Sequence, residues 1–399
     1  MPTDRTARNI FLFYVFRILN LPFFWLPILY IYLTQVKGFS VVQTTFLLSL
    51  QELTMIFLEI PTGVVADKVS RKFSVALGYI VQALPLIFLP FIAGFYDVIL
   101  LFVIKAMGRS LVSGADSSLL YDTLVDGGRQ KDYKKIVTRA NAWMMAVAAV
   151  AMLGGGYLGQ MGYFNWSFYL PLPFQLVGAM AAISMYEPDV SRKAKELQEK
   201  NYLKHIWQAS RSVMSNRKIL IYVLLFSVFE ATAINMKWYY PAMFEGMGFT
   251  LLATGGVMAI LYFGKSLLGL LGTTFIHEDA LENVTNWTKV VVIAWLVVAL
   301  FQVWPIVVAG LMIVGMGVEL LCSSTEELLH DSMNSQTRAT SMSFVNLISS
   351  VVATLLLWGW GGAITLGGVS TGLWLQVGIF AVAAGAIVWR AHTVLRAGL

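Results

Sequence analysis

The chain has 399 residues and a net charge of +6, and 58% of its residues are hydrophobic while only 13% are charged. Soluble globular proteins carry about a quarter of their residues as charged side chains. This composition therefore excludes a soluble globular fold and indicates a surface covered by lipid. The single cysteine, Cys322, excludes an internal disulfide framework and a cysteine-based zinc site, and the four histidines are too scattered to suggest a metal cluster. We expect no metal and no cofactor.

Twelve apolar stretches are long enough to cross the hydrocarbon core, which takes about 20 apolar residues in a helix. The first is too long for the core of a signal peptide and is expected to stay in the mature protein. Only the break at Val303-Trp304-Pro305 separates the ninth stretch from the tenth. The sequence thus predicts an all-α membrane protein with twelve transmembrane helices, at 9–36, 40–66, 73–94, 96–122, 136–160, 165–186, 218–244, 250–275, 287–303, 304–330, 335–361 and 370–390.

The basic residues predict how these helices are oriented. Lysine and arginine concentrate in the cytoplasmic loops of membrane proteins. Here they occur in every second connection and near both ends of the chain, with Lys37 as the one exception. This alternation places the N- and C-termini in the cytoplasm and the chain in the cell membrane (inner or plasma membrane) as a multi-pass protein. It also accounts for the positive net charge, so we expect no nucleic-acid partner.

One long polar stretch divides the helices into two groups of six. We expect an N-terminal six-helix bundle at 1–186, a cytoplasmic linker at 187–217 and a C-terminal six-helix bundle at 218–399. Apolar residues recur at helical spacing among the lysines and arginines of the linker, which predicts an amphipathic helix on the membrane surface. A solvated linker helix is the alternative.

A weak internal repeat supports this division. Segments 117–124 and 326–333 end the fourth and tenth predicted helices with similar residues, and Thr-Arg-Ala opens the fifth and eleventh. Such matches between the two halves are typical of transporters built from parallel repeats.

The loop after the second predicted helix carries a recognisable motif, Gly63-Val64-Val65-Ala66-Asp67-Lys68-Val69-Ser70-Arg71-Lys72. It resembles the signature of the major facilitator superfamily, Gly-x-x-x-Asp-Arg/Lys-x-Gly-Arg-Arg/Lys, at the place where that family carries it. The twelve helices and the central loop extend this resemblance over essentially the whole chain. The one departure is Ser70, where glycine is usual; if the backbone there needed a positive φ, serine would cost about 1 kcal/mol.

The resemblance implies a cytoplasmic gate that involves Gly63, Asp67, Arg71 and Asp122. Asp67 would lie at the N-terminus of the eleventh helix, where the helix dipole favours a carboxylate. Arg71 would bridge to Asp122 at the foot of the fourth helix, and together they would hold the cytoplasmic side closed. The alternative, that the basic residues of this loop only enforce orientation, does not explain the two aspartates.

Two further segments are similar to family motifs. Residues 109–115 resemble the family's intramembrane arginine followed by glycine, with a spacing one residue longer than usual. Residues 154–159 resemble the glycine-rich motif of the drug/proton antiporter branch, without its proline. Small residues also let helices pack closely in any membrane protein, so packing is the alternative explanation for these glycines.

Ionisable residues at bilayer depth cost several kcal/mol and usually face a cavity or a partner. Seven such residues are the candidates for a cavity that binds substrate and protons: Arg17, Glu52, Arg109, Asp116, Glu230, Lys265 and Glu319. They occur on predicted helices one, two, four, seven, eight and ten, which line the central cavity in the plan of the family that the chain resembles. Static ion pairing between helices is the alternative for any one of them.

The candidates differ in the role we expect. Glu52, Glu230, Glu319 and Asp116 are candidate proton carriers, because moving a cation near a carboxylate changes its proton affinity. Arg109 and Lys265 are the expected counter-charges. On the fourth predicted helix, Lys105, Arg109 and Asp116 are four and seven residues apart and therefore share one face. Glu59, just before Pro61, is assigned to the gate.

Five aromatic residues near the outer ends of helices one and seven could form the walls of a substrate site: Trp25, Tyr30, Trp238, Tyr239 and Tyr240. Tryptophan and tyrosine are also enriched at the membrane interface. We favour the interfacial interpretation.

These features predict a monomeric secondary transporter that moves a small organic molecule by alternating access, coupled to protons and in the direction of export. A proton-coupled uptake symporter for an organic anion, or a lipid flippase, is the alternative. A receptor or membrane enzyme on the same scaffold is the alternative outside transport, but the short loops carry no catalytic Asp/His/Cys cluster. No Gly-x-x-x-x-Gly-Lys-Ser/Thr motif is present, which excludes an ATP-driven pump within this chain.

Overall fold

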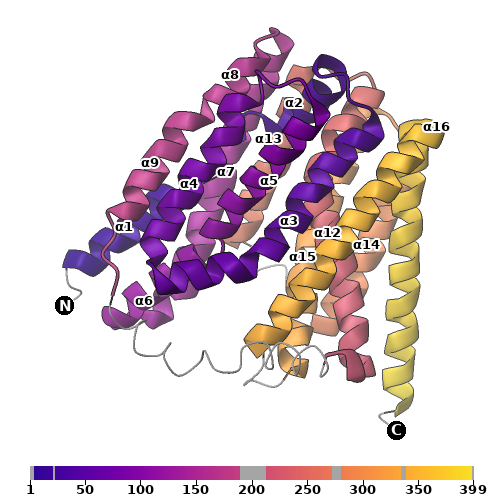
Figure 1. The fold of residues 1–399 in the computed structure, drawn as a ribbon. Coiled ribbons are helices and arrows are strands. Elements are labelled where there is room, and N and C mark those ends of the chain that lie inside the picture. Colours follow the sequence, from indigo (N-terminus) through magenta and orange to yellow (C-terminus); the bar gives the residue numbers. More distant parts are fainter. Residues whose placement is uncertain (1–3, 21–22, 189–212, 272–279, 334–337, 398–399) are drawn as a thin grey trace. The chain divides into compact units, whose positions relative to one another are not determined.

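The computed structural model describes the chain except for residues 1–3, 21–22, 189–212, 272–279, 334–337 and 398–399 (Figure 1). Within the described residues all regular structure is helical, without a strand. Nine described segments are long and apolar enough to cross a membrane, and two shorter apolar helical segments cover Leu26–Val36 and Leu251–Leu267. The prediction of an all-α membrane protein is confirmed.

By their contacts the residues form two compact units, Met1–Lys200 with Phe249–Leu270, and Asn201–Gly248 with Leu271–Leu399. We call them the first and the second unit. Residues 189–212, where the amphipathic linker helix is expected, lie outside the described residues. The division into bundles at 1–186 and 218–399 stays a prediction.

The first unit holds the predicted helices one to six, three of them in more pieces than expected. Its elements are α1 (Asp4–Leu19), α2 (Leu26–Ile31), the π-helix η1 (Tyr32–Val36), α3 (Val41–Lys68), α4 (Arg71–Phe88), α5 (Phe95–Val112), α6 (Ala115–Asp126), the 3-10 turn η2 (Gln130–Asp132), α7 (Tyr133–Gln160), α8 (Phe164–Tyr169) and α9 (Pro171–Ile183). Most of α13 (Leu251–Leu271) also belongs to this unit, where Ser266 donates a 2.8 Å hydrogen bond to the carbonyl of Ala142 on α7.

The fourth predicted helix, 96–122, is broken in the middle. Gly114 has a φ of +76°, a left-handed conformation that glycine adopts without a steric penalty. Ser113 before it is extended in ψ, at 132°, so α5 ends at Val112 and α6 starts at Ala115. The predicted span 9–36 is likewise divided, because α1 ends at Leu19 and α2 starts at Leu26 with Pro27 in its first turn.

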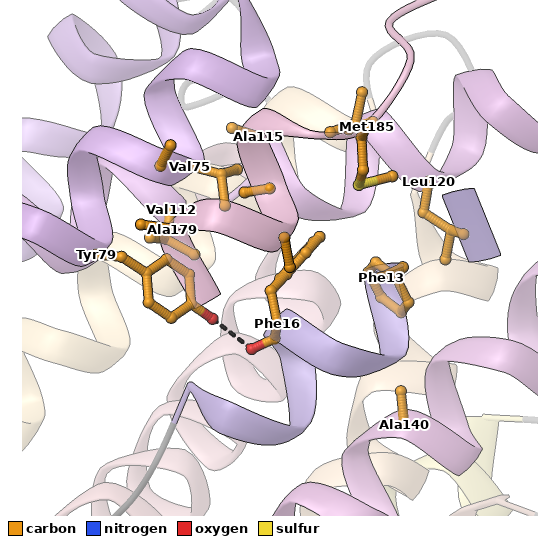
Figure 2. Packing of buried hydrophobic residues seen from close by; sticks show 14 of the residues in the cluster. Phe13, Phe16, Val75, Tyr79, Val112, Ala115, Leu120, Ala140, Ala179 and Met185 are labelled. Carbon is orange, nitrogen blue, oxygen red and sulfur yellow. Dashed lines mark hydrogen bonds between the residues drawn. The ribbon is translucent and has the colours of Figure 1, made fainter. Parts of the chain in front are cut away.

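The core of the first unit is built on aromatic rings from α1 and α4 (Figure 2). Phe13 and Phe16 pack edge to face with centroids 5.3 Å apart, and Phe16 packs in the same way against Tyr79 at 6.4 Å. The buried hydroxyl of Tyr79 donates a hydrogen bond to the carbonyl of Phe16, which satisfies the polar end of the ring. Gly178 of α9 lies directly against the Tyr79 ring, so a side chain there would displace it.

The second unit contains α12 (Arg217–Gly246), α14 (Ala280–Phe301), α15 (Trp304–Ser332) and α16 (Arg338–Ala397). Val303 is extended and Pro305 lies in the first turn of α15, so the predicted break at 303–305 is confirmed. The stretch assigned to α16 is two helices, because Gly367 and Gly368 have non-helical backbone angles. That break separates the predicted spans 335–361 and 370–390.

Lys37, the exception among the loop charges, has a structural explanation. Its ammonium group donates hydrogen bonds to the carbonyls of Pro90, at 3.2 Å, and Ile92, at 2.6 Å, just after the end of α4. It also lies 5.4 Å from the centre of the Tyr32 ring. Cations stabilise the carbonyl groups left unpaired at the C-terminal end of a helix. Lys37 therefore caps the C-terminal end of α4, and its position says little about how the helices are oriented in the membrane.

Two neighbouring glycines of α7 give a matched test of how this helix packs against Phe24. A Cβ at position 155 would overlap the backbone carbonyl of Phe24, whereas one at position 154 would meet only the Phe24 ring, at 3.1 Å. We expect Gly155→Ala to destabilise the protein by about 1–3 kcal/mol, typical of overpacking, and Gly154→Ala to cost much less because a side chain can move.

The measurement is the melting temperature of the purified variants in detergent. A clearly lower value for Gly155→Ala than for Gly154→Ala is expected. Equal melting temperatures would show that α7 does not lie against the Phe24 backbone.

Candidate functional site

An ion pair connects Arg17, in the last turn of α1, with Asp116, in the first turn of α6. Arg17 Nε also donates a 2.9 Å hydrogen bond to Asn141 Oδ1 on α7. The second carboxylate oxygen of Asp116 accepts a 2.6 Å hydrogen bond from the backbone of Ser117. The N-terminus of α6 favours a negative charge at this position. The break before α6 therefore gives the buried Asp116 two kinds of stabilisation.

A second ion pair connects α3 and α5. Glu52 Oε1 lies 3.2 Å from Arg109 Nη1, and the Glu52 side chain is 9% exposed while that of Arg109 is 29% exposed. Both residues lie inside helices that are apolar enough to span the membrane. A carboxylate at such a depth requires a partner of opposite charge or a proton.

The expectation that Lys105, Arg109 and Asp116 share one helix face is wrong, because the backbone breaks at Gly114 between the second and third of them. They also contact different groups. Arg109 binds Glu52, Asp116 binds Arg17, and the buried Lys105 places its ammonium 3.2 Å from the centre of the Trp25 ring. This is a cation–π geometry, which a low-dielectric environment strengthens.

The remaining candidates lie apart from these pairs in the chain. Lys265 is half-buried on α13, in the first unit, while Glu230 on α12 and Glu319 on α15 are half-buried in the second unit. The structure thus joins four of the seven candidates in two ion pairs, an arrangement that static pairing also explains. That all seven line one cavity stays a prediction. Among the described residues, no three His, Cys, Asp or Glu side chains are grouped as metal ligands.

Arg71 of the motif forms the ion pair with Asp122 on α6 that the resemblance implies. The two side chains are 12% and 16% exposed, so the pair is largely shielded from solvent. Gly63 lies within α3, and Asp67 lies in the last turn of that helix. The side chain of Asp67 and the region just before α16 are outside the described residues, so the contact expected for Asp67 stays a prediction.

Ser70 is not strained. Its φ of −176° is extended backbone that any residue adopts, so the expected cost of serine at a glycine position does not arise. Its hydroxyl accepts a 3.3 Å hydrogen bond from the backbone N–H of Phe73, which makes Ser70 the N-cap of α4. Serine is therefore a suitable residue at this position.

Glu187 is a residue of this loop region that the sequence interpretation missed. Its carboxylate accepts hydrogen bonds from the Ser70 hydroxyl, at 2.5 Å, and from the Arg71 backbone N–H, at 2.8 Å. It therefore ties the chain beyond α9 to the start of α4, where the helix dipole favours a negative charge. The available signal was an acidic residue directly before Pro188 at the end of the sixth predicted helix.

The interfacial interpretation of the five aromatic residues is wrong. Trp25, Tyr30, Trp238, Tyr239 and Tyr240 are all buried, with at most 6% of their surface exposed. Tyr239 stacks on Trp360 with ring centroids 4.2 Å apart. The hydroxyl of Tyr239 lies beside the side-chain amides of Gln376 and Asn235. These rings are part of the packing inside their own units.

Comparison with known proteins agrees with the helical plan and the motif. The sequence profile of the Major Facilitator Superfamily matches residues 9–279. A relative described as the uncharacterized MFS-type transporter YxaM of Bacillus subtilis is 23% identical over 259 residues, which is 64% of this chain and 63% of that protein. The matched part thus spans under two thirds of this relative's length.

Solved transporter structures share the fold. A point mutant of the nucleoside transporter NupG has a TM-score of 0.79 at 15% identity, over 96% of this chain and 99% of that one. A D-xylose-proton symporter has a TM-score of 0.75 at 11% identity, over 96% and 97% of the two chains. A bacterial homologue of the human lysosomal transporter Spinster has 0.74 at 15%, over 99% of both.

The profile covers well over half of the chain, and the fold, the apolar helices and the motif loop agree with it. The chain is a multi-pass protein of the cell membrane that belongs to the major facilitator superfamily.

Proposed function

We propose that this transporter is secondary active and proton-coupled, and that it exports a small organic molecule by alternating access. The observation that carries the coupling is that two carboxylates inside membrane-spanning helices, Glu52 and Asp116, are each bound to an arginine of another helix. Glu230 and Glu319 are further candidate carboxylates, and Lys265 is a further candidate counter-charge.

The coupling follows from the cost of charge in the membrane. An ionised carboxylate at bilayer depth is stable only while a cation lies beside it, and a bound proton removes that need. Protonation of Glu52 would release Arg109, which weakens the contact between α3 and α5. Protonation of Asp116 would release Arg17 and weaken the contact between α1 and α6. Proton binding and helix movement are then linked, so that each shifts the equilibrium of the other.

The substrate class and the direction of transport are proposed from the solved structures that share the fold and from one sequence motif. Proteins that share this fold are described as transporters of nucleosides, D-xylose with protons, and organic anions. Export is supported by the resemblance of residues 154–159 to the antiporter motif, although Gly155 and Gly156 also lie directly against the backbones of Phe24 and α13. Uptake of an organic anion and lipid flipping remain the alternatives that a transport assay separates.

The proposed cycle also needs a gate on the cytoplasmic side. The shielded ion pair between Arg71 and Asp122 supports such a role, together with the position of Asp67 at the end of α3. Opening this side would require the Arg71–Asp122 pair to separate or to move as one body. Gly63, Asp67, Arg71 and Asp122 are the residues that we assign to the gate.

The coupling is tested by flux into vesicles that contain the purified protein, with an imposed pH gradient and a panel of uridine, D-xylose, 5-aminolevulinic acid and ethidium. For the compound that is moved, Glu52→Gln and Asp116→Asn should lose the component driven by the pH gradient and keep exchange without a gradient. An amide cannot release a proton, but it leaves the shape of the site intact. The sign of the gradient that drives accumulation gives the direction of transport.

Matched controls are Asp132→Asn, which removes an exposed carboxylate 2.7 Å from Arg129, and Glu326→Gln, which removes an exposed carboxylate near His330. Both should transport like the wild type. If Glu52→Gln and Asp116→Asn keep their full pH-driven flux, the coupling is not carried by these residues.

The gate is tested with Asp122→Asn and Asp67→Asn. We expect a transport rate several-fold lower with little change in substrate affinity, because the closed cytoplasmic side is destabilised while the substrate site is untouched. Asp126→Asn is the matched control, since Asp126 is exposed one turn further along α6. Rate and affinity are obtained from initial uptake rates and from equilibrium binding of the same compound. Loss of binding at an unchanged rate would contradict a gating role.

A further inference from the structure

A row of polar contacts runs along the packed faces of α3 and α5. Glu52 binds Arg109, Glu59 accepts a 3.3 Å hydrogen bond from the hydroxyl of Ser113, and the hydroxyl of Thr62 lies 2.7 Å from that of Ser110. Glu52 and Glu59 are seven residues apart and therefore lie on the same face of α3. The row ends at the break between α5 and α6.

Glu59 differs from Glu52, Asp116 and Asp122, each of which is bound to an arginine. It is half-buried at the end of the apolar stretch Val41–Glu59, yet among the described residues no cation lies within ion-pair distance of it. The guanidinium group that acts on it electrostatically, Arg109, is bound to Glu52. An isolated carboxylate in such a place is neutralised by a proton more cheaply than it is kept ionised.

The charged groups around Glu59 are few. α5 contributes Arg109 and, one turn before it, Lys105, which rests on the Trp25 ring, while Glu52 lies two turns away on α3 itself. α4, which also packs against α3, carries Arg71 and Lys72 at its start, where Arg71 is bound to Asp122. η1, which also contacts α3, has no charged residue. Because Arg109 is bound to Glu52 and Lys105 rests on the Trp25 ring, one proton would neutralise Glu59.

We infer that Glu59 holds a proton in this state, and that Arg109 exchanges between Glu52 and Glu59 during transport. The inference rests on the proposed proton coupling and assigns that role to a residue first placed in the gate. When the proton leaves Glu59, two carboxylates compete for one guanidinium group. Arg109 then binds Glu59, the carboxylate nearer the break, and the proton that left Glu59 moves to Glu52 or to water.

The position of Ser113 connects this exchange to the backbone. Ser113 is the residue that follows α5, and Gly114 after it has the positive φ that separates α5 from α6. A rotation at these two residues would move the Ser113 hydroxyl relative to Glu59. The hydrogen bond that stabilises the protonated or ionised acid thus depends on the angle between the two helices.

The proton is detected by infrared spectroscopy of the purified protein at neutral pH, as the C=O stretching band of a protonated carboxyl group. Glu59→Gln should remove this band while leaving the Glu52–Arg109 pair and the melting temperature unchanged. The double variant Glu52→Gln/Arg109→Gln removes the neighbouring pair without leaving an unpaired charge, and it should keep the band. A band that persists in Glu59→Gln, or that disappears in the double variant, would overturn the inference.

Vesicle flux separates this inference from the proposed function. Glu59→Gln should lose pH-driven flux and keep exchange without a gradient. If Glu59→Gln loses the band but keeps full pH-driven flux, Glu59 has no part in coupling while the proposed function stands. If the wild type itself shows no pH-driven flux, the proposed coupling fails for every residue, whatever the spectrum of Glu59→Gln shows.

Discussion

The cost of placing charge in hydrocarbon governs the arrangement of this protein. Within the described helices of the first unit, Asp116 lies against Arg17 and Glu52 against Arg109, each pair joining two helices. Lys105 rests on the face of Trp25, and Lys37 lies on the carbonyls after α4. Each contact holds separate helices together because leaving a charge alone costs several kcal/mol. In the proposed cycle the same contacts would become movable once a proton or a substrate takes the place of one partner.

Breaks in the helices determine where these charges lie. Asp116 is stabilised at the start of α6 only because α5 ends shortly before it, at Val112, and Gly114 redirects the backbone. Non-helical backbone at membrane depth is tolerated only where protein or water surrounds it. Ser113 and Gly114 are therefore expected to face protein or water and not lipid, in agreement with the polar contacts that Glu59, Ser110 and Thr62 make nearby.

The helical spans were predictable because hydrophobicity over about 20 residues is a strong signal, and Pro305 marked the boundary of α15. The break at Gly114 was not predictable, since glycine is common inside membrane helices. The pairs of Arg17 with Asp116 and of Arg109 with Glu52 could be identified only from the structure. The sequence shows which charged residues lie in apolar helices, but it does not show which of them contact each other. The burial of Trp25 and Tyr239 was missed because tryptophan and tyrosine favour both cores and interfaces.

Glu187 has a mechanical consequence. Its carboxylate is fastened to Ser70 and to the backbone of Arg71, and Arg71 is fastened in turn to Asp122. Soon after Glu187 the chain enters the long connection towards α12. A force that acts on the chain beyond Glu187 would therefore not stop at the end of α9. Such a force would act on the first turn of α4 and, through the Arg71 guanidinium group, on α6. The connection is therefore attached to residues of the proposed gate.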